Sequence, residues 1–211
     1  MDRRIIALVK KDFRFSGNYL MAVLTFPTVY YAGTWAEYTF AHVVEEQDGF
    51  IICLIIVGLS TLPLTHSFKR EQGPSTRQFL STLPVRTGEI YIANMIAMFL
   101  YMVLLAAMVL LGSRIFGTPC DVQFLLAAMS MGIFYNSVYI LIYYMVSFNV
   151  SQVFLIGSIM IPMMFVGGFD INLSTLGFFS DLHITLPACI AMVAAAICII
   201  ALLCKLKRRI L

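Results

Sequence analysis

The chain has 211 residues, of which 61% are hydrophobic and only 12% are charged. A water-soluble domain is about 45 to 50% apolar and about 25% charged, so this composition excludes a protein whose surface lies mainly in water. One crossing of a hydrocarbon core takes about 20 apolar residues, and the length therefore accommodates about six crossings with their connections but no further folded domain. We expect an all-α integral membrane protein with a single domain over residues 1–211.

The leader, residues 1–18, predicts an amphipathic helix ahead of the first crossing. At about 100° per residue, its basic side chains share one arc and its apolar side chains the opposite arc. The two sets are Arg3, Arg4, Lys10, Lys11 and Arg14 against Ile5, Ile6, Val9 and Phe13. Opposed faces of this kind are typical of a helix lying in the membrane interface, here on the cytoplasmic leaflet. The alternative is a basic flank of the first span without a defined helix.

Six apolar runs follow the leader and predict six transmembrane helices. They are Tyr19–Trp35, Phe50–Phe68, Ile90–Phe116, Phe124–Phe148, Val153–Gly168 and Ile184–Cys204. The fifth run is short, which leaves a re-entrant segment as an alternative to a full crossing. Prolines in or at the start of four runs, Pro27, Pro63, Pro162 and Pro187, predict kinks or local breaks.

The distribution of basic residues predicts the orientation. Lys and Arg next to membrane spans are retained on the cytoplasmic side. Thirteen of the 14 basic residues lie in the leader, in the loop from Lys69 to Glu89 or in the tail, and Arg114 alone lies on the other side. Both ends of the chain are therefore expected in the cytoplasm.

The long cytoplasmic loop, residues 69–89, has polar ends and an apolar middle. Gly73 and Pro74 predict the end of the second span, and Pro84 predicts the end of a short helix on the membrane surface. The apolar residues on one face of that helix are Phe79, Leu80 and Leu83. Such a face either fills a groove on a partner protein or dips into lipid, and the residues by themselves leave both readings open.

The order of these elements resembles the permease subunits of type 2 ABC exporters. The resemblance rests on a basic leader ending in Leu8–Phe13, on Lys69–Gly73, and on Phe79–Arg86 followed by Glu89 and Ile90. It implies that the leader is an elbow helix, that the 69–89 loop is a coupling loop docking on an ATPase, and that six spans form half of a dimeric transporter. The chain departs from the family pattern after Gly73, where Pro74 and Ser75 replace the usual Thr and aromatic residue, and this affects the start of the coupling helix.

The resemblance also implies which residues contact the ATPase. They belong to the coupling loop: Arg77, Phe79, Leu80 and Leu83, with Glu71 and Arg86 at its edges. The chain has no GxxxxGK[ST] phosphate loop, so we expect it to be no enzyme and to hold no cofactor, ATP and magnesium belonging to the separate ATPase. The expected partners are that ATPase, a second permease copy or paralogue, and the lipid bilayer, with no nucleic acid.

The fourth span carries a stripe of three tyrosines spaced four residues apart, Tyr135, Tyr139 and Tyr143, with Asn136 beside them. Tyrosine has an apolar body and a hydrogen-bonding tip, so the stripe predicts either a translocation path for an amphipathic substrate or a seal between helices. Both alternatives stay open.

A metal site is a weaker possibility, built from residues of two outer loops: His42, Glu45, Glu46, Asp181 and His183. Imidazole and carboxylate groups are zinc ligands, but solvated acidic flanks explain the same residues more simply. We expect no metal.

These features together predict the membrane-spanning subunit of an ATP-driven exporter, multi-pass in a bacterial cytoplasmic membrane. The resemblance favours a hydrophobic or amphipathic peptide as the molecule that is moved or resisted. The alternative is a non-transporting membrane anchor or regulatory subunit. An ion-driven carrier is disfavoured, because the spans hold no ionisable group between the membrane ends.

Overall fold

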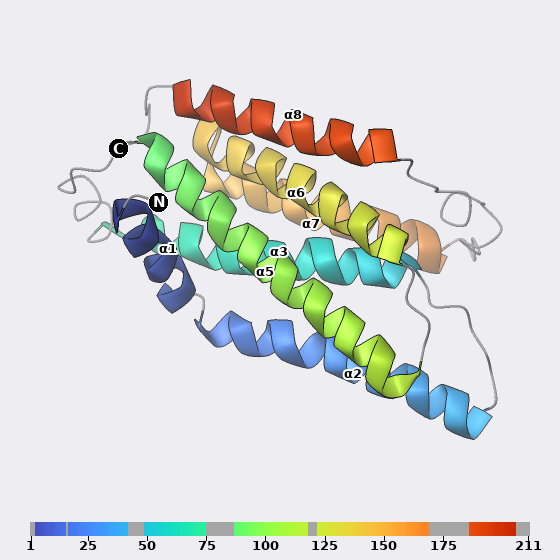
Figure 1. The fold of residues 1–211 in the computed structure, drawn as a ribbon. Coiled ribbons are helices and arrows are strands. Elements are labelled where there is room, and N and C mark those ends of the chain that lie inside the picture. Colours follow the sequence, from blue (N-terminus) through green and yellow to red (C-terminus); the bar gives the residue numbers. More distant parts are fainter. Residues whose placement is uncertain are drawn as a thin grey trace.

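The computed structural model describes residues 3–15, 17–41, 49–74, 87–117, 122–168 and 186–205. The described residues form seven α-helices and no strand (Figure 1). Their bounds are α1 Arg3–Phe15, α2 Gly17–Ala41, α3 Gly49–Glu71, α5 Thr87–Phe116, α6 Val122–Met145, α7 Phe148–Gly168 and α8 Leu186–Lys205. The all-α class and the separate leader helix predicted from the sequence are confirmed.

The long helices have lengths suited to a bilayer, though they differ in apolar character. Within the described part of the chain, two helical stretches are long and apolar enough to cross a membrane, Gly88–Phe116 and Leu125–Met145. The apolar stretches Phe148–Ser158 and Cys189–Lys205 are shorter. Pro27 and Pro63 lie inside α2 and α3, which both continue past them without a break.

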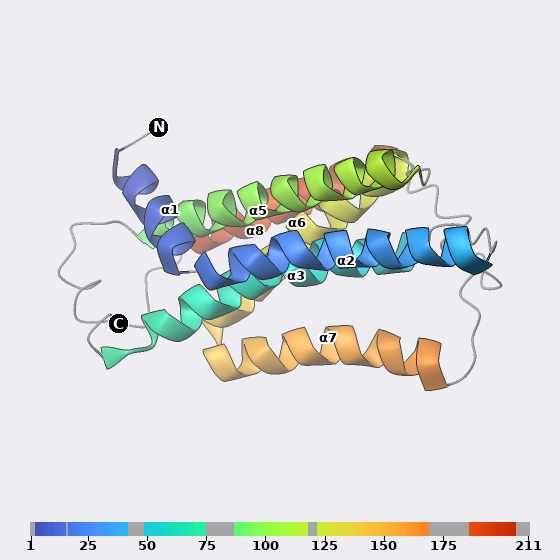
Figure 2. The same cartoon turned by 90° about the horizontal axis from the view of Figure 1, so that it is seen from below.

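The helices pack around α3, α5 and α6, which contact one another (Figures 1 and 2). On the outside of this group, α2 packs on α3 and α5, α8 packs on α5 and α6, and α7 packs on α3 and α6. The short helix α1 lies obliquely across one end of the bundle, against α3 and α5.

The turn between α6 and α7 differs from the sequence prediction. The fourth span was expected to run to Phe148 and the fifth to begin at Val153, but α6 ends at Met145 and α7 begins at Phe148. Ser147 explains the early start, because its Oγ accepts a hydrogen bond from the Val150 amide at 3.3 Å, as an N-cap residue does. The fifth segment is consequently one helix of 21 residues and not a short run.

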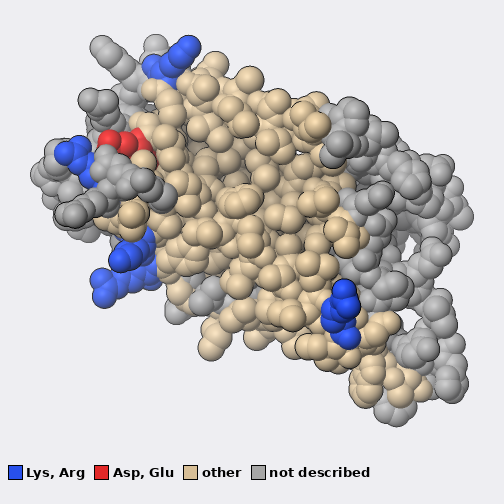
Figure 3. Space-filling view, in the orientation of Figure 1, with Lys and Arg blue, Asp and Glu red and all other residues tan. Residues whose placement is uncertain are grey.

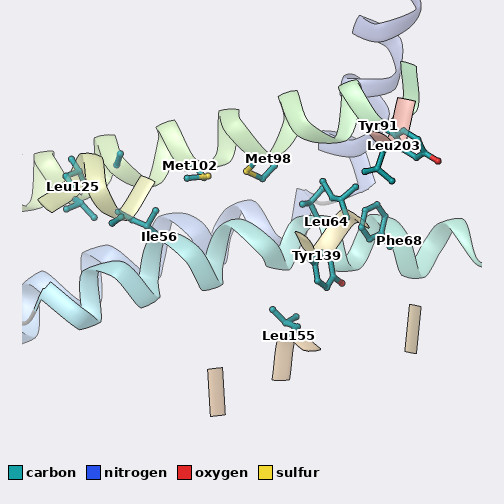
Figure 4. Close-up of a cluster of buried hydrophobic side chains, with 14 of the residues drawn as sticks. Ile56, Leu64, Phe68, Tyr91, Met98, Met102, Leu125, Tyr139, Leu155 and Leu203 are labelled. Atoms are coloured by element: carbon teal, nitrogen blue, oxygen red, sulfur yellow. The ribbon is translucent and has the colours of Figure 1, made fainter. Parts of the chain in front are cut away.

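The largest buried cluster joins all six long helices of the described chain, and Figure 4 shows part of it. Figure 4 labels Ile56, Leu64, Phe68, Tyr91, Met98, Met102, Leu125, Tyr139, Leu155 and Leu203. Large apolar side chains on the outer surface remain exposed, such as Ile115 at 73% and Val153 at 70%. Such a surface is suited to lipid and unsuited to water.

Basic residues gather at the end of the bundle where α1 lies (Figure 3). Lys69 and Arg70 end α3 there, and Lys205 ends α8. The ends of α8 and α5 meet, since a Cβ added to Gly88 would lie 3.3 Å from Cys204 Sγ. Arg114, in the last turn of α5, lies at the opposite end.

Candidate functional site

The leader helix α1 rests on the start of α5 as well as on the bundle end. Leu8 and Val9 are buried, at 5% and 8% exposure, in a cluster with Ile90 and Ala93. Ile6 on the same helix remains 40% exposed. Part of the apolar arc that was expected to face lipid is therefore covered by protein.

A buried ion pair joins α1 to the last residue of α3. Lys11 Nζ donates to Glu71 Oε1 at 2.8 Å and also lies 3.3 Å from Asp12 Oδ1. The side chains of Glu71 and Asp12 are only 4% and 3% exposed, and Lys11 is 16% exposed. Ser67 Oγ adds a second link by donating to Asp12 Oδ1 at 2.8 Å. The sequence pattern placed Lys11 on the basic face of the leader. Its side chain instead points inward, because the carboxylates of Glu71 and Asp12 attract it.

Burial and charge act in opposite directions on these groups. Burial lowers the pKa of Lys11, but the carboxylates of Glu71 and Asp12 outweigh it and hold that pKa above its usual 10.5. Burial raises the pKa of Asp12 above its usual 3.8, although Lys11 and the Ser67 hydroxyl favour the charged carboxylate. The pair Lys11 and Glu71 is thus ionic, while Asp12 takes up a proton more readily than an exposed aspartate.

The part of the coupling loop between α3 and α5, residues 72–86, begins directly after this ion pair. The backbone amides of Gln72 and Gly73 donate to Phe68 and Arg70 carbonyls at 3.2 and 3.1 Å, which closes the last turn of α3. The predicted stop of the second span at Gly73 is confirmed. Glu71, predicted at the edge of the ATPase contact, is buried against α1 in this chain. The remaining predicted contacts, Arg77, Phe79, Leu80, Leu83 and Arg86, lie outside the described residues.

The predicted stripe on α6 faces α3 in its middle portion. Asn136 is fully buried and binds two hydroxyl groups of α3. Its Oδ1 accepts from Thr61 Oγ1 at 2.9 Å, and its Nδ2 donates to Ser60 Oγ at 3.0 Å. The same Nδ2 donates to the Gly132 carbonyl one turn earlier, at 2.9 Å. Both N–H groups of this amide and its oxygen are therefore hydrogen-bonded within the protein.

Tyr139, one turn further along α6, ties three helices together. Its hydroxyl accepts a hydrogen bond from Gln152 Nε2 of α7 at 2.6 Å and shares another with Thr65 Oγ1 of α3 at 3.0 Å. Tyr135 makes a second contact with α7, through a hydrogen bond with Ser158 Oγ at 2.5 Å. These bonds form a polar seam between α3, α6 and α7, which we define by Ser60, Thr61, Thr65, Tyr135, Asn136, Tyr139, Gln152 and Ser158.

The last residue of the stripe, Tyr143, continues it with an aromatic contact. Its ring stacks on Phe68 with the centroids 3.8 Å apart. Its neighbour Tyr144 accepts a hydrogen bond from Asn94 Nδ2 at 3.0 Å. The four predicted path residues thus make contacts between helices of one chain, which is the arrangement expected of a seal. A translocation path along them stays a prediction.

Sequence reasoning missed the partners of this stripe and the inward direction of Lys11. The hydroxyl residues at positions 60, 61 and 65 share one side of a helix, which was a usable signal for a polar helix contact. The acidic residue Asp12, between Lys11 and Phe13 in a basic leader, was a signal that part of the leader is buried. The possible zinc ligands His42, Glu45, Glu46, Asp181 and His183 lie outside the described residues, and the described residues hold no cluster suited to a metal ion.

An all-helical bundle with an apolar outer surface and one basic end defines a class, that of α-helical membrane proteins. Residues 7–205 match the family model described as ABC-2 family transporter protein. Because the match covers nearly the whole chain, the chain belongs to the ABC-2 transporter family and is a membrane permease of an ABC transporter. The resemblance drawn from the leader and the coupling loop is confirmed. No curated protein and no solved structure matches the chain.

Proposed function

We propose that the chain is the membrane-spanning subunit of an ATP-driven exporter, with both chain ends in the cytoplasm. The six crossings would be α2, α3, α5, α6, α7 and α8. Family membership supports a permease, and the gathering of Lys and Arg at the α1 end supports the orientation, because basic residues beside spans are retained in the cytoplasm.

The coupling loop of this permease would dock on a separate ATPase. The observation that carries this proposal is the position of the two ends of the loop. The loop leaves α3 and enters α5 at the same basic end of the bundle where α1 is anchored. A loop that leaves the membrane at that end reaches a cytoplasmic partner. Since the chain has no phosphate loop of its own, ATP hydrolysis falls to that partner.

The molecule moved would be a hydrophobic or amphipathic peptide, by two copies of the permease or a copy with a paralogue, in a bacterial cytoplasmic membrane. This part of the proposal rests on the resemblance to small stand-alone permeases of type 2 exporters. The exposed apolar surface of the bundle is compatible with a bilayer and with a second permease subunit.

The decisive experiment removes the apolar face of the coupling loop. The double variant Phe79→Ala, Leu80→Ala should leave the permease in the membrane and abolish co-purification of the ATPase, because central buried anchors of an interface contribute about 2 kcal/mol or more each. A matched control is the double variant Leu111→Ala, Ile115→Ala, which removes two exposed apolar side chains at the opposite end of α5 and should retain the ATPase.

Each outcome has a clear reading. Retained ATPase and wild-type transport in the coupling-loop variant would exclude docking through Phe79 and Leu80. A permease that never retains an ATPase, in the wild type or in either variant, would favour the alternative of a non-transporting anchor or regulatory subunit.

A further inference from the structure

The helix α1 contacts both ends of the coupling loop. Lys11 and Asp12 bind Glu71 and Ser67 at the end of α3, just before the loop begins. One turn earlier, Leu8 and Val9 pack on Ile90 and Ala93, just after the loop has rejoined α5. A single short helix therefore bridges the departure and the return of the segment 72–86.

We propose that α1 is a strap that fixes the two ends of the coupling loop relative to each other, with Lys11 and Glu71 as its positioning residues. The consequence for transport rests on the proposed function, whereas the strap itself is a property of the permease. With this strap in place, a displacement of the coupling loop would move the adjoining ends of α3 and α5 together.

The chemistry of the contact explains why an ion pair is suited to this task. An isolated helix of 13 residues is marginal in water, so α1 takes its position from its contacts. Apolar packing such as that of Leu8 and Val9 allows a helix to slide, but a hydrogen-bonded charge pair fixes one register. The buried carboxylate of Glu71 also makes other registers costly, because sliding would separate it from the ammonium group of Lys11.

The chain offers a matched control beside the proposed residue. Lys10 has the same side chain as Lys11 and precedes it directly, but it is exposed. Lys11→Ala and Lys10→Ala remove the same chemical group from the same helix. A general effect of lost positive charge on the membrane surface would be the same in both variants, whereas the strap requires only Lys11.

The test measures the position of α1 relative to the end of α3 by electron paramagnetic resonance. Spin labels are attached to Ala7→Cys and Gln72→Cys in a cysteine-free, full-length permease held in lipid nanodiscs. The parent protein and Lys10→Ala should each give one narrow distance distribution, and Lys11→Ala should give a distribution at least about twice as broad, because α1 then has several registers. Lys11→Arg, which keeps the charge and the hydrogen bond, should restore the narrow distribution.

A second variant guards against misfolding. Lys11→Met with Glu71→Leu and Asp12→Asn removes the charge of Lys11 and of both carboxylates that lie against it, so the bundle should fold while the strap is lost. An unchanged narrow distribution in this triple variant, or in a folded Lys11→Ala, would overturn the proposal.

The functional arm uses the ATPase that co-purifies with the wild-type permease. In Lys11→Ala the maximal rate of permease-dependent ATP hydrolysis should fall about tenfold, a loss of about 1.4 kcal/mol in coupling, with the KM for ATP unchanged and with recovery in Lys11→Arg. An unchanged maximal rate would overturn the role of the strap in transport. If no ATPase co-purifies at all, the proposed function fails, and the distance measurement still decides whether the strap exists.

Discussion

Tyr31 of α2 lies against the bare backbone of Gly112 in α5. A Cβ added to Gly112 would lie 2.8 Å from Tyr31 Cγ, closer than side chains tolerate. Tyr31 is fully buried, and its ring lies parallel to that of Phe116 with the centroids 6.5 Å apart. Within a bilayer, close approach of this kind holds helices together, because lipid provides no hydrophobic drive for their association.

We expect Gly112→Ala to weaken the contact between α2 and α5. The added methyl group meets a ring that is enclosed on all sides, and overpacking of this kind costs about 1 to 3 kcal/mol. The control Gly33→Ala adds a methyl group where nothing lies within 4 Å, and it should be neutral or stabilising by up to about 1 kcal/mol. Thermal unfolding in detergent micelles measures both, and equal midpoints for the two variants would contradict the packing role of Gly112.

The orientation is testable with described residues at the two ends of the bundle. A cysteine at Gln72, in an otherwise cysteine-free permease, should react with a membrane-impermeant maleimide only from the cytoplasmic side. A cysteine at Arg114 should react only from the outside, since α5 carries that residue to the opposite end. Labelling of Gln72→Cys in intact cells would show that the inferred orientation is wrong.

The polar seam predicts an interaction between α6 and α7. Tyr139→Phe removes the hydroxyl that binds Gln152 and Thr65 and should destabilise the permease by about 0.6 to 1.7 kcal/mol, between the average and the largest value for a hydrogen bond between transmembrane helices. In a double-mutant cycle with Gln152→Leu, the two losses should be less than additive, because both variants break the same hydrogen bond between Tyr139 and Gln152. Thr28→Val is the control, as that hydroxyl is exposed and donates within its own helix, to the Leu24 carbonyl. Fully additive losses would mean that Tyr139 and Gln152 do not interact.

The raised pKa of Asp12 predicts a dependence on pH. A raised pKa means that the folded state binds the proton more tightly than the unfolded state, so lowering the pH from about 7 toward about 4 increases the free energy of unfolding contributed by Asp12. Lys11 stays charged over this range because its pKa is above 10.5. In Asp12→Asn the contribution disappears.

The measurement is the difference in unfolding midpoint between the wild type and Asp12→Asn, at about pH 7 and about pH 4.5. The unfolding midpoint of the wild type, relative to that of Asp12→Asn, should be higher at the lower pH. The other carboxylates are the same in both proteins, so their contribution cancels in the difference. A difference that is constant with pH would show that Asp12 titrates as an exposed aspartate does.

The sequence by itself was sufficient for the helical class, the six apolar runs, the amphipathic leader and the likeness to ABC-2 permeases. These properties depend on composition and on spacings within a few turns, which local periodicity and the position of charges report directly. The end of α3 followed from Gly73 and Pro74 for the same reason. The start of α7 did not, because the residues around Ser147 are uncharged and its capping hydrogen bond leaves no mark on the hydropathy pattern.

Only the tertiary structure decided which residues meet. A helical wheel placed Lys11 among the basic residues facing solvent, but it carries no information about a carboxylate 60 residues further on. Asn136 was recognisable as a polar residue in a span, yet its partner Thr61 lies 75 residues away on another helix. The lipid-facing and helix-facing sides of a transmembrane helix are both largely apolar, so periodicity cannot distinguish lipid from a neighbouring helix. The pairing of α1 with α3 and of α6 with α7 came from polar contacts that form only after the helices have assembled.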